Sequence, residues 1–107
     1  MNSEIVVQKI HNQDCPLCSG SAEFQFIDYE NRKHFRCKNC IEFVMSVRAE
    51  GRLANSIQQW RHQYSEMAKK SNQEKIFVIT IPSIVKQDGV ANAEIQGEFI
   101  LRSTLRL

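Results

Sequence analysis

All four cysteines of this 107-residue chain lie in two Cys-x-x-Cys pairs, at residues 15–18 and 37–40, with eighteen residues between the pairs. A Cys-x-x-Cys turn presents two thiolates to one ion, and two such turns complete the tetrahedral coordination that Zn²⁺ prefers. Intervening segments of about 15–20 residues are typical of zinc sites. We therefore predict one structural Zn²⁺ ion bound by Cys15, Cys18, Cys37 and Cys40. Four protein ligands leave no position for a reactive water, so no metal-based hydrolysis is expected.

Two other uses of these thiols stay open. Cys15-Pro16-Leu17-Cys18 is similar to the Cys-Pro-x-Cys of glutaredoxin-type oxidoreductases, but those place the cysteine at a helix N-terminus within a βαβ unit, and the flanks here are strand-like. The same four thiols could also hold an iron–sulfur cluster. His11, His34 and His62 are surplus to a four-cysteine site and are expected at the surface or half-buried. With no phosphate-binding loop and no paired Ser/His/Asp set, the sequence predicts a protein that is not an enzyme.

The elements that must position the cysteines can be read from the apolar pattern. Alternating or β-rich stretches predict strands on either side of a polar turn at residues 30–33, and the second cysteine pair follows the strand that leaves this turn. The result is an antiparallel meander held by the metal. The predicted strands are 4–10, 22–29, 34–37 and 41–47.

After the meander the apolar period lengthens. Leu53, Ile57, Trp60, Tyr64 and Met67 are spaced as one stripe of an amphipathic helix over residues 52–70, which we expect to pack on the sheet. A partner-binding or dimer helix is the alternative. The candidate core residues are Phe24, Phe26, Phe35, Phe43, Ile57, Trp60 and Tyr64.

The last third of the chain is β-rich. A strand over residues 76–81 and a second stretch over 94–107 predict a hairpin, with Phe99, Leu101, Leu105 and Leu107 on one face. Such a hairpin must dock on the ribbon, on a second copy or on a partner, so Phe99, Leu101 and Leu105 are candidate partner-binding residues and a homodimer is possible. The sequence thus predicts a small α+β zinc β-ribbon over residues 1–70, with one helix, extended by a β-hairpin over 76–107.

Charge is unevenly distributed along the chain. The net charge is only +2, yet residues 31–62 carry seven Lys or Arg against two Glu. Arg32, Lys33, Arg36 and Lys38 cluster around the second cysteine pair, which makes a nucleic-acid-binding ribbon the alternative function. Phe35 shares its strand face with Cys37 and should lie in the core, so it cannot stack on a base.

The remaining composition favours a soluble protein of the cytoplasm. No apolar run approaches the roughly 20 residues of a membrane span, and the first residues lack the basic start of a secretory signal. Thiols stay reduced in that compartment, which favours metal binding over disulfides.

Three motifs together resemble the Lar-type restriction alleviation proteins, which are small zinc ribbons of phages and prophages. They are the Cys15–Gly20 knuckle, Phe35–Cys40, and Ala54-Asn55-Ser56-Ile57-Gln58-Gln59-Trp60-Arg61, within about residues 13–63. Ser19 and Ile41 replace the glycine that follows each knuckle in that family, and Arg61 replaces an asparagine. The resemblance implies a non-enzymatic anti-defence protein, in the cytoplasm of a bacterial host, that modulates a type I restriction–modification complex.

Overall fold

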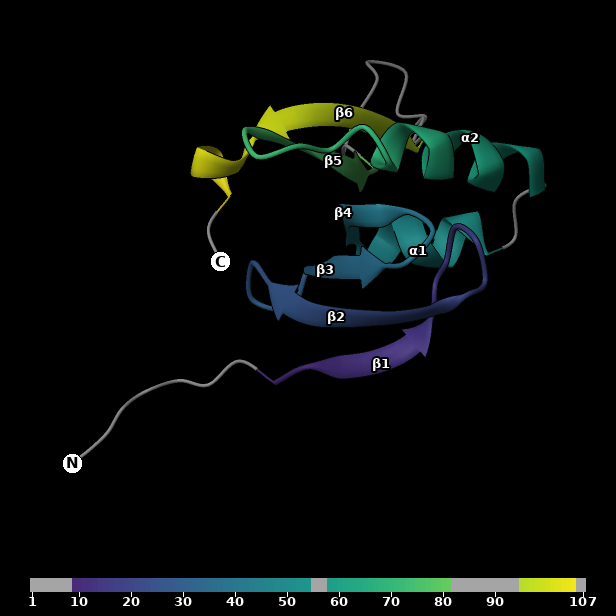
Figure 1. Ribbon diagram of the computed structural model, residues 1–107. Coiled ribbons are helices and arrows are strands. Elements are labelled where there is room, and N and C mark those ends of the chain that lie inside the picture. The colour runs from purple at the N-terminus through teal and green to yellow at the C-terminus, as the bar shows by residue number, and fades with distance from the viewer. Residues whose placement is uncertain (1–8, 55–57, 82–94, 106–107) are drawn as a thin grey trace, which may run out of the picture.

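The computed structural model describes residues 9–54, 58–81 and 95–105, which form one six-stranded sheet flanked by helices (Figure 1). The strands lie in the sheet in chain order: β1 (His11–Asp14), β2 (Ser21–Ile27), β3 (Arg32–Cys37), β4 (Ile41–Ser46), β5 (Lys75–Thr80) and β6 (Gln96–Leu101). Neighbours are antiparallel except β4 and β5, which run parallel and are separated in the chain by α1 (Val47–Leu53) and α2 (Gln58–Ala68). This small α+β architecture, with its cysteines gathered in two pairs, confirms the predicted fold class and is consistent with a zinc ribbon.

Strands β2, β3 and β4 form the predicted meander, with Phe24 opposite Phe35 and Phe35 opposite Phe43. The turn between β2 and β3 begins at Asp28, two residues before the predicted turn. Asp28, Tyr29 and Glu30 have φ values of 53°, 54° and 67°, a left-handed backbone that cannot continue a strand. The strand predicted over residues 4–10 lies mostly outside the described residues; β1 begins at His11.

The single helix predicted over residues 52–70 is replaced by two helices. Strand β4 ends at Ser46, whose Oγ accepts a hydrogen bond from the Ala49 backbone N–H at 3.1 Å and so caps α1 several residues earlier than predicted. Helix α1 buries Ala49 and Leu53, while α2 buries Ser65 and Ala68. Because α1 ends at Leu53, the predicted stripe does not belong to one helix.

This break corrects one core prediction. Trp60 is 52% exposed on α2, so the prediction that it lies in the core is wrong. Tyr64 is half-buried against the core, as predicted for a packing residue, whereas Ile57 lies outside the described residues.

The main core lies between the sheet and the two helices, both of which contact β4 and β5. Phe24, Phe35 and Phe43 are buried there as predicted, and Phe26 packs against them half-buried. The cysteines belong to the same cluster. A second, smaller cluster on the other face of the sheet comprises Ile27, Val44, Ile76 and Val78, with Ile100 and Leu105 against it.

The C-terminal hairpin extends this sheet. β5 pairs with β6 as predicted, and β5 joins the ribbon through Val44 opposite Val78 and Met45 opposite Ile79. β6 stops at Leu101 because a 3₁₀ turn (Arg102–Thr104) follows, closed by Thr104 Oγ1 donating to the Leu101 carbonyl at 2.6 Å.

This turn separates the three candidate partner-binding residues. Phe99 packs in the helix-side core and Leu105 packs in the cluster on the other face. Leu101 is 45% exposed at the sheet edge. The prediction that these side chains share one face is therefore wrong, because Leu105 does not lie on the strand.

None of the helices in the described segments is both long and apolar enough to span a membrane.

Two glycines give a matched pair of stability predictions. A Cβ on Gly97 would overlap Cζ of Phe77, a ring that is 1% exposed and held between Tyr64 and Phe99. We expect Gly97→Ala to lower the free energy of unfolding by about 1–3 kcal/mol, because the core cannot accept the added methyl group. A Cβ on Gly51, within α1, meets nothing within 4 Å, so Gly51→Ala should raise stability by about 0.5–1 kcal/mol. Urea denaturation of both variants measures the change in the free energy of unfolding. A change of the same sign in both variants would contradict the prediction.

Candidate metal centre

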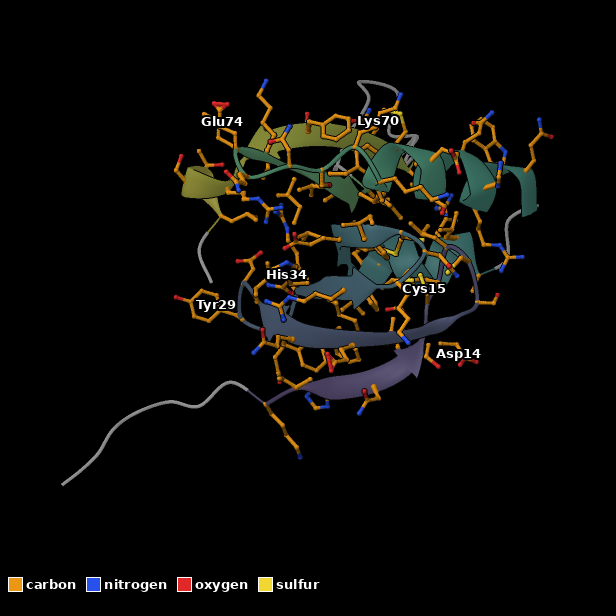
Figure 2. All side chains as sticks on the ribbon, in the orientation of Figure 1. Asp14, Cys15, Tyr29, His34, Lys70 and Glu74 are labelled. Carbon is orange, nitrogen blue, oxygen red and sulfur yellow. The ribbon has the colours of Figure 1, made fainter. Side chains whose placement is uncertain are left out.

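The antiparallel pairing of the strands brings the two cysteine pairs together. The first pair lies in the turn between β1 and β2, and the second runs from Cys37, the last residue of β3, to Cys40 in the turn before β4. Ala22 stands opposite Cys37 in the β2–β3 register, so both turns lie at the same end of the sheet. Figure 2 shows Cys15 at this end and His34 toward the other.

The four thiols have the geometry of a tetrahedral ligand set. All four Sγ atoms lie within 4.8 Å of one another. Cys15 and Cys40 Sγ are 3.8 Å apart, and Cys18 and Cys37 Sγ are 3.4 Å apart. Four sulfurs at about 2.3 Å from a tetrahedral Zn²⁺ would lie about 3.8 Å from one another. None of the four forms a disulfide. The predicted ligands therefore form one cluster that can hold a metal ion.

Polar groups around the cluster are placed to stabilise thiolates. The Leu17 backbone N–H lies 3.4 Å from Cys15 Sγ, and Asn39 Nδ2 lies 3.5 Å from Cys18 Sγ. Ser65 Oγ, from α2, is 3.0 Å from Cys40 Sγ. Donors of this kind orient the ligands and offset their charge. Sequence reasoning missed Ser65, which is five per cent exposed, because nothing in its local sequence marks a contact with residue 40.

Crowding of the sulfurs also shifts their acidities. The pKa of Cys15 is raised by its hydrogen bond to Cys40 and by burial, and burial raises the pKa of Cys37. Burial also raises the pKa of Cys18, but hydrogen bonds from Gly20 and Asn39 outweigh that effect and bring it to about 7. A bound cation would favour the thiolate form of every one of these groups.

The residue after each knuckle adopts a left-handed backbone conformation. Ser19 has φ 67° and Ile41 has φ 71°. These are the two positions where the Lar-type pattern has glycine. A left-handed conformation costs a residue with a side chain about 1–2 kcal/mol, and a β-branched residue is an outlier there. Ile41 also leaves 53% of its side chain in solvent.

We therefore expect Ile41→Gly to stabilise the zinc-loaded protein. Relief of the backbone strain should exceed the added entropy of glycine and the loss of half-buried contacts, for a net gain of about 0.5–1 kcal/mol. Ser19→Gly should act in the same direction. Thermal denaturation with excess zinc measures both; a loss of stability in Ile41→Gly would show that the side chain contributes more to folding than the strain costs.

A second polar cluster joins the ribbon to the C-terminal hairpin. The Glu42 carboxylate accepts hydrogen bonds from both terminal nitrogens of Arg102, at 2.9 and 2.7 Å. His34 Nε2 lies 2.6 Å from Glu42 Oε2, and because a carboxylate can only accept, this nitrogen carries the proton. Arg102 and His34 lower the pKa of Glu42 to about 2, and burial lowers the pKa of His34. His34 is buried, more so than the sequence predicted.

The four predicted nucleic-acid-binding residues are split between two environments. Arg32 lies 3.8 Å from Asp28, and Lys33 Nζ lies 2.8 Å from Glu50 and 4.4 Å from the centre of the Phe24 ring. These two cations are therefore paired within the chain. Arg36 and Lys38 are exposed, and no ion pair of the described residues includes either of them.

Neither of the other two histidines belongs to the four-cysteine cluster. His11 stacks on Phe24 at 4.9 Å between ring centres, and His62 is exposed beside a small hollow of about 210 Å³ that also includes Cys18 and Arg61.

Comparisons with protein-family models, with curated proteins and with solved structures found no match.

Proposed function

We propose that this chain is a non-catalytic zinc-ribbon protein of the phage or prophage type that binds and modulates a bacterial restriction–modification protein in the host cytoplasm. Two features support the proposal: the four-cysteine cluster and the Ala54–Arg61 motif that resembles the Lar-type proteins. The four-cysteine cluster would stabilise the fold, and the resemblance of the Ala54–Arg61 motif is the reason for proposing a restriction–modification protein as the target.

Zinc is the metal we propose for the cluster. Four thiolates are soft ligands, and a closed tetrahedral set of sulfurs suits Zn²⁺. Iron in the same set is the competing metal, and the two are separated by the colour of the purified protein and by elemental analysis. With four protein ligands, zinc would act as a structural ion rather than as a Lewis acid.

The observation that carries the proposal is the exposure of Trp60. This residue distinguishes the Lar-type motif from zinc ribbons in general, and its ring is 52% exposed on α2. An exposed tryptophan contributes little to folding, whereas tryptophan is enriched among the residues that dominate protein interfaces. We assign Trp60 to the contact with the target.

A nucleic-acid-binding ribbon is the second candidate, because Arg36 and Lys38 are exposed beside the second knuckle without partners in the described residues. Binding driven by phosphates weakens steeply as salt concentration rises, whereas binding through an apolar protein interface does not.

The test is capture of partners by tagged, zinc-loaded protein from a bacterial lysate, with and without nuclease, read by mass spectrometry. A restriction–modification subunit that survives nuclease and is lost in Trp60→Ala would support the proposal. Gln63→Ala, also exposed on α2, is the matched control and should retain capture. Capture that disappears with nuclease would favour the nucleic-acid function instead.

A further inference from the structure

We infer that the hollow beside the second knuckle is the binding site for an acidic segment of the partner protein that also carries an apolar side chain. The inference rests on the proposed function, in that the partner is a protein, and it places a second contact beyond Trp60. The hollow has a volume of about 430 Å³, and its lining includes Ala22, Glu23, Arg36, Lys38 and Ile41.

The first argument is the pair of cations at this hollow. Arg36 stands opposite Glu42 in the β3–β4 register, where an ion pair would be expected. Both Glu42 oxygens are instead engaged by Arg102, and one of them by His34 as well. Glu23 stands opposite Arg36 in the β2–β3 register, but no ion pair of the described residues joins the two, so the guanidinium of Arg36 remains available to a carboxylate of a partner.

Arg36 is also not placed to neutralise the metal centre. Side chains alternate along a strand, so Arg36 and Cys37 project from opposite faces of β3. Cys37 is buried with the other sulfurs, while Arg36 is exposed. Lys38, in the knuckle turn, adds a second exposed cation, and Glu23 is the one carboxylate that the described residues contribute to the lining of the hollow.

The second argument is Ile41, which lines the same hollow. Its side chain is 53% exposed, and its backbone is left-handed with φ 71°. A glycine or asparagine would adopt this conformation at lower cost and without exposing an apolar surface. Both knuckles share this backbone conformation, but it does not require an isoleucine, and strain kept at an exposed residue is characteristic of binding sites. Ile41, which stands opposite Cys37 in the β3–β4 register, therefore serves as the apolar anchor of the hollow.

The residues that line the hollow also indicate which class of partner it binds. Among the residues that the structure describes, no aromatic side chain lines the hollow, so they offer no ring on which a nucleic-acid base could stack. Ile41 supplies apolar surface, and Arg36 and Lys38 supply hydrogen-bond donors for carboxylates. A peptide segment with glutamate or aspartate on either side of a leucine-sized residue matches both properties.

The test uses zinc-loaded, isotope-labelled protein and three probes: a decapeptide of Glu-Leu repeats, the corresponding Lys-Leu peptide, and a ten-nucleotide oligo-dT. We expect the acidic peptide alone to shift the amide resonances of residues 36–41 and their neighbours in β2. The double variant Arg36→Glu/Lys38→Glu should weaken its binding at least about tenfold, whereas Arg48→Glu, an exposed cation on α1, should not. Shifts centred elsewhere, or none at millimolar peptide, would overturn the inference. An equal response to oligo-dT would assign the hollow to phosphates.

Ile41→Gly provides the sharper readout, because stability and binding should change in opposite directions. We expect this variant to melt at a higher temperature and to bind the acidic peptide less tightly. Ser19→Gly, which relieves the same kind of strain at the other knuckle, should melt higher with unchanged binding. Loss of both properties in Ile41→Gly would indicate a structural role and contradict the inference.

The two proposals can fail separately. If lysate capture depends on Trp60 but is unchanged in Ile41→Gly, the partner is a protein and the hollow is not its site. If the acidic peptide binds as expected but no restriction–modification subunit is captured, the hollow stands and the proposed target is wrong.

Discussion

Replacing Cys37 by serine is expected to abolish metal binding and cooperative folding together. Structural zinc contributes roughly 10–16 kcal/mol of apparent binding free energy in small zinc domains, more than the net stability of most folded domains. Cys37 is 7% exposed and belongs to the main core cluster, so an empty site would also leave three crowded thiols, of which Cys15 and Cys40 are buried. Native mass spectrometry should show one Zn²⁺ per chain in the parent protein and none in the variant, and thermal denaturation should lose its sharp transition.

Chelation provides the control that leaves the sequence intact. Excess chelator should reproduce the unfolded behaviour of Cys37→Ser, and added zinc should reverse it in the parent protein alone. Asn39→Ala, which removes the 3.5 Å contact to Cys18 Sγ and no ligand, should weaken zinc affinity while retaining the transition. A Cys37→Ser variant that still melts sharply without metal would show that the fold does not depend on the ion.

Arg102→Met should have the second largest effect, a loss of about 2 kcal/mol in the free energy of unfolding. Removing one partner of a buried ion pair costs about 3–5 kcal/mol, and Glu42 is partly exposed, which reduces the penalty. The pKa of Glu42 is held at about 2 chiefly by Arg102. The stability that this carboxylate contributes is present above its ordinary pKa and is lost as pH falls toward 2. Without Arg102 the pKa of Glu42 should lie closer to its ordinary value, so the acid-induced loss of stability should be smaller and should be complete at a higher pH.

His34 reports on the same substitution. Arg102 is one of the charges that lower the pKa of His34, so the pKa should rise in Arg102→Met. NMR titration of the His34 ring between about pH 5 and 8 measures the change, and urea denaturation at neutral pH measures the stability. Arg48→Met, an exposed residue of α1, should alter neither. An unchanged His34 titration in Arg102→Met would mean that the cluster is not coupled as the distances indicate.

The metal cluster and the meander could be predicted from the sequence because their signals are local. Cysteine spacing identified the ligand set, and alternation placed the strands around it. The helical region could not be predicted in the same way. Leu53 and Trp60 fit one stripe by spacing, but Ser46 caps a separate helix that ends at Leu53, and Trp60 lies exposed on the next helix, α2.

The Glu42–Arg102 cluster was beyond sequence reasoning for a different reason. Its two charged residues are sixty positions apart and meet only because β5 pairs with β4 in parallel. The sequence pattern predicted one β-rich stretch over residues 94–107, whereas β6 ends at Leu101, one residue before Arg102. Long-range pairing of this kind leaves no periodic trace in the chain.

The order of the strands in the sheet has a consequence for how the chain acquires its shape. Each strand pairs with the strand that precedes it in sequence. β5 is joined to β4 through α1 and α2, whereas the strands of the meander are joined by short turns. Loop closures of this length are entropically cheap, and topologies rich in local contacts reach the native state quickly. During synthesis from the N-terminus, all four cysteines and strands β2, β3 and β4 precede the first residue of β5. A meander with a complete set of four thiols is then present before the hairpin is made, and β5 can add to the edge formed by β4.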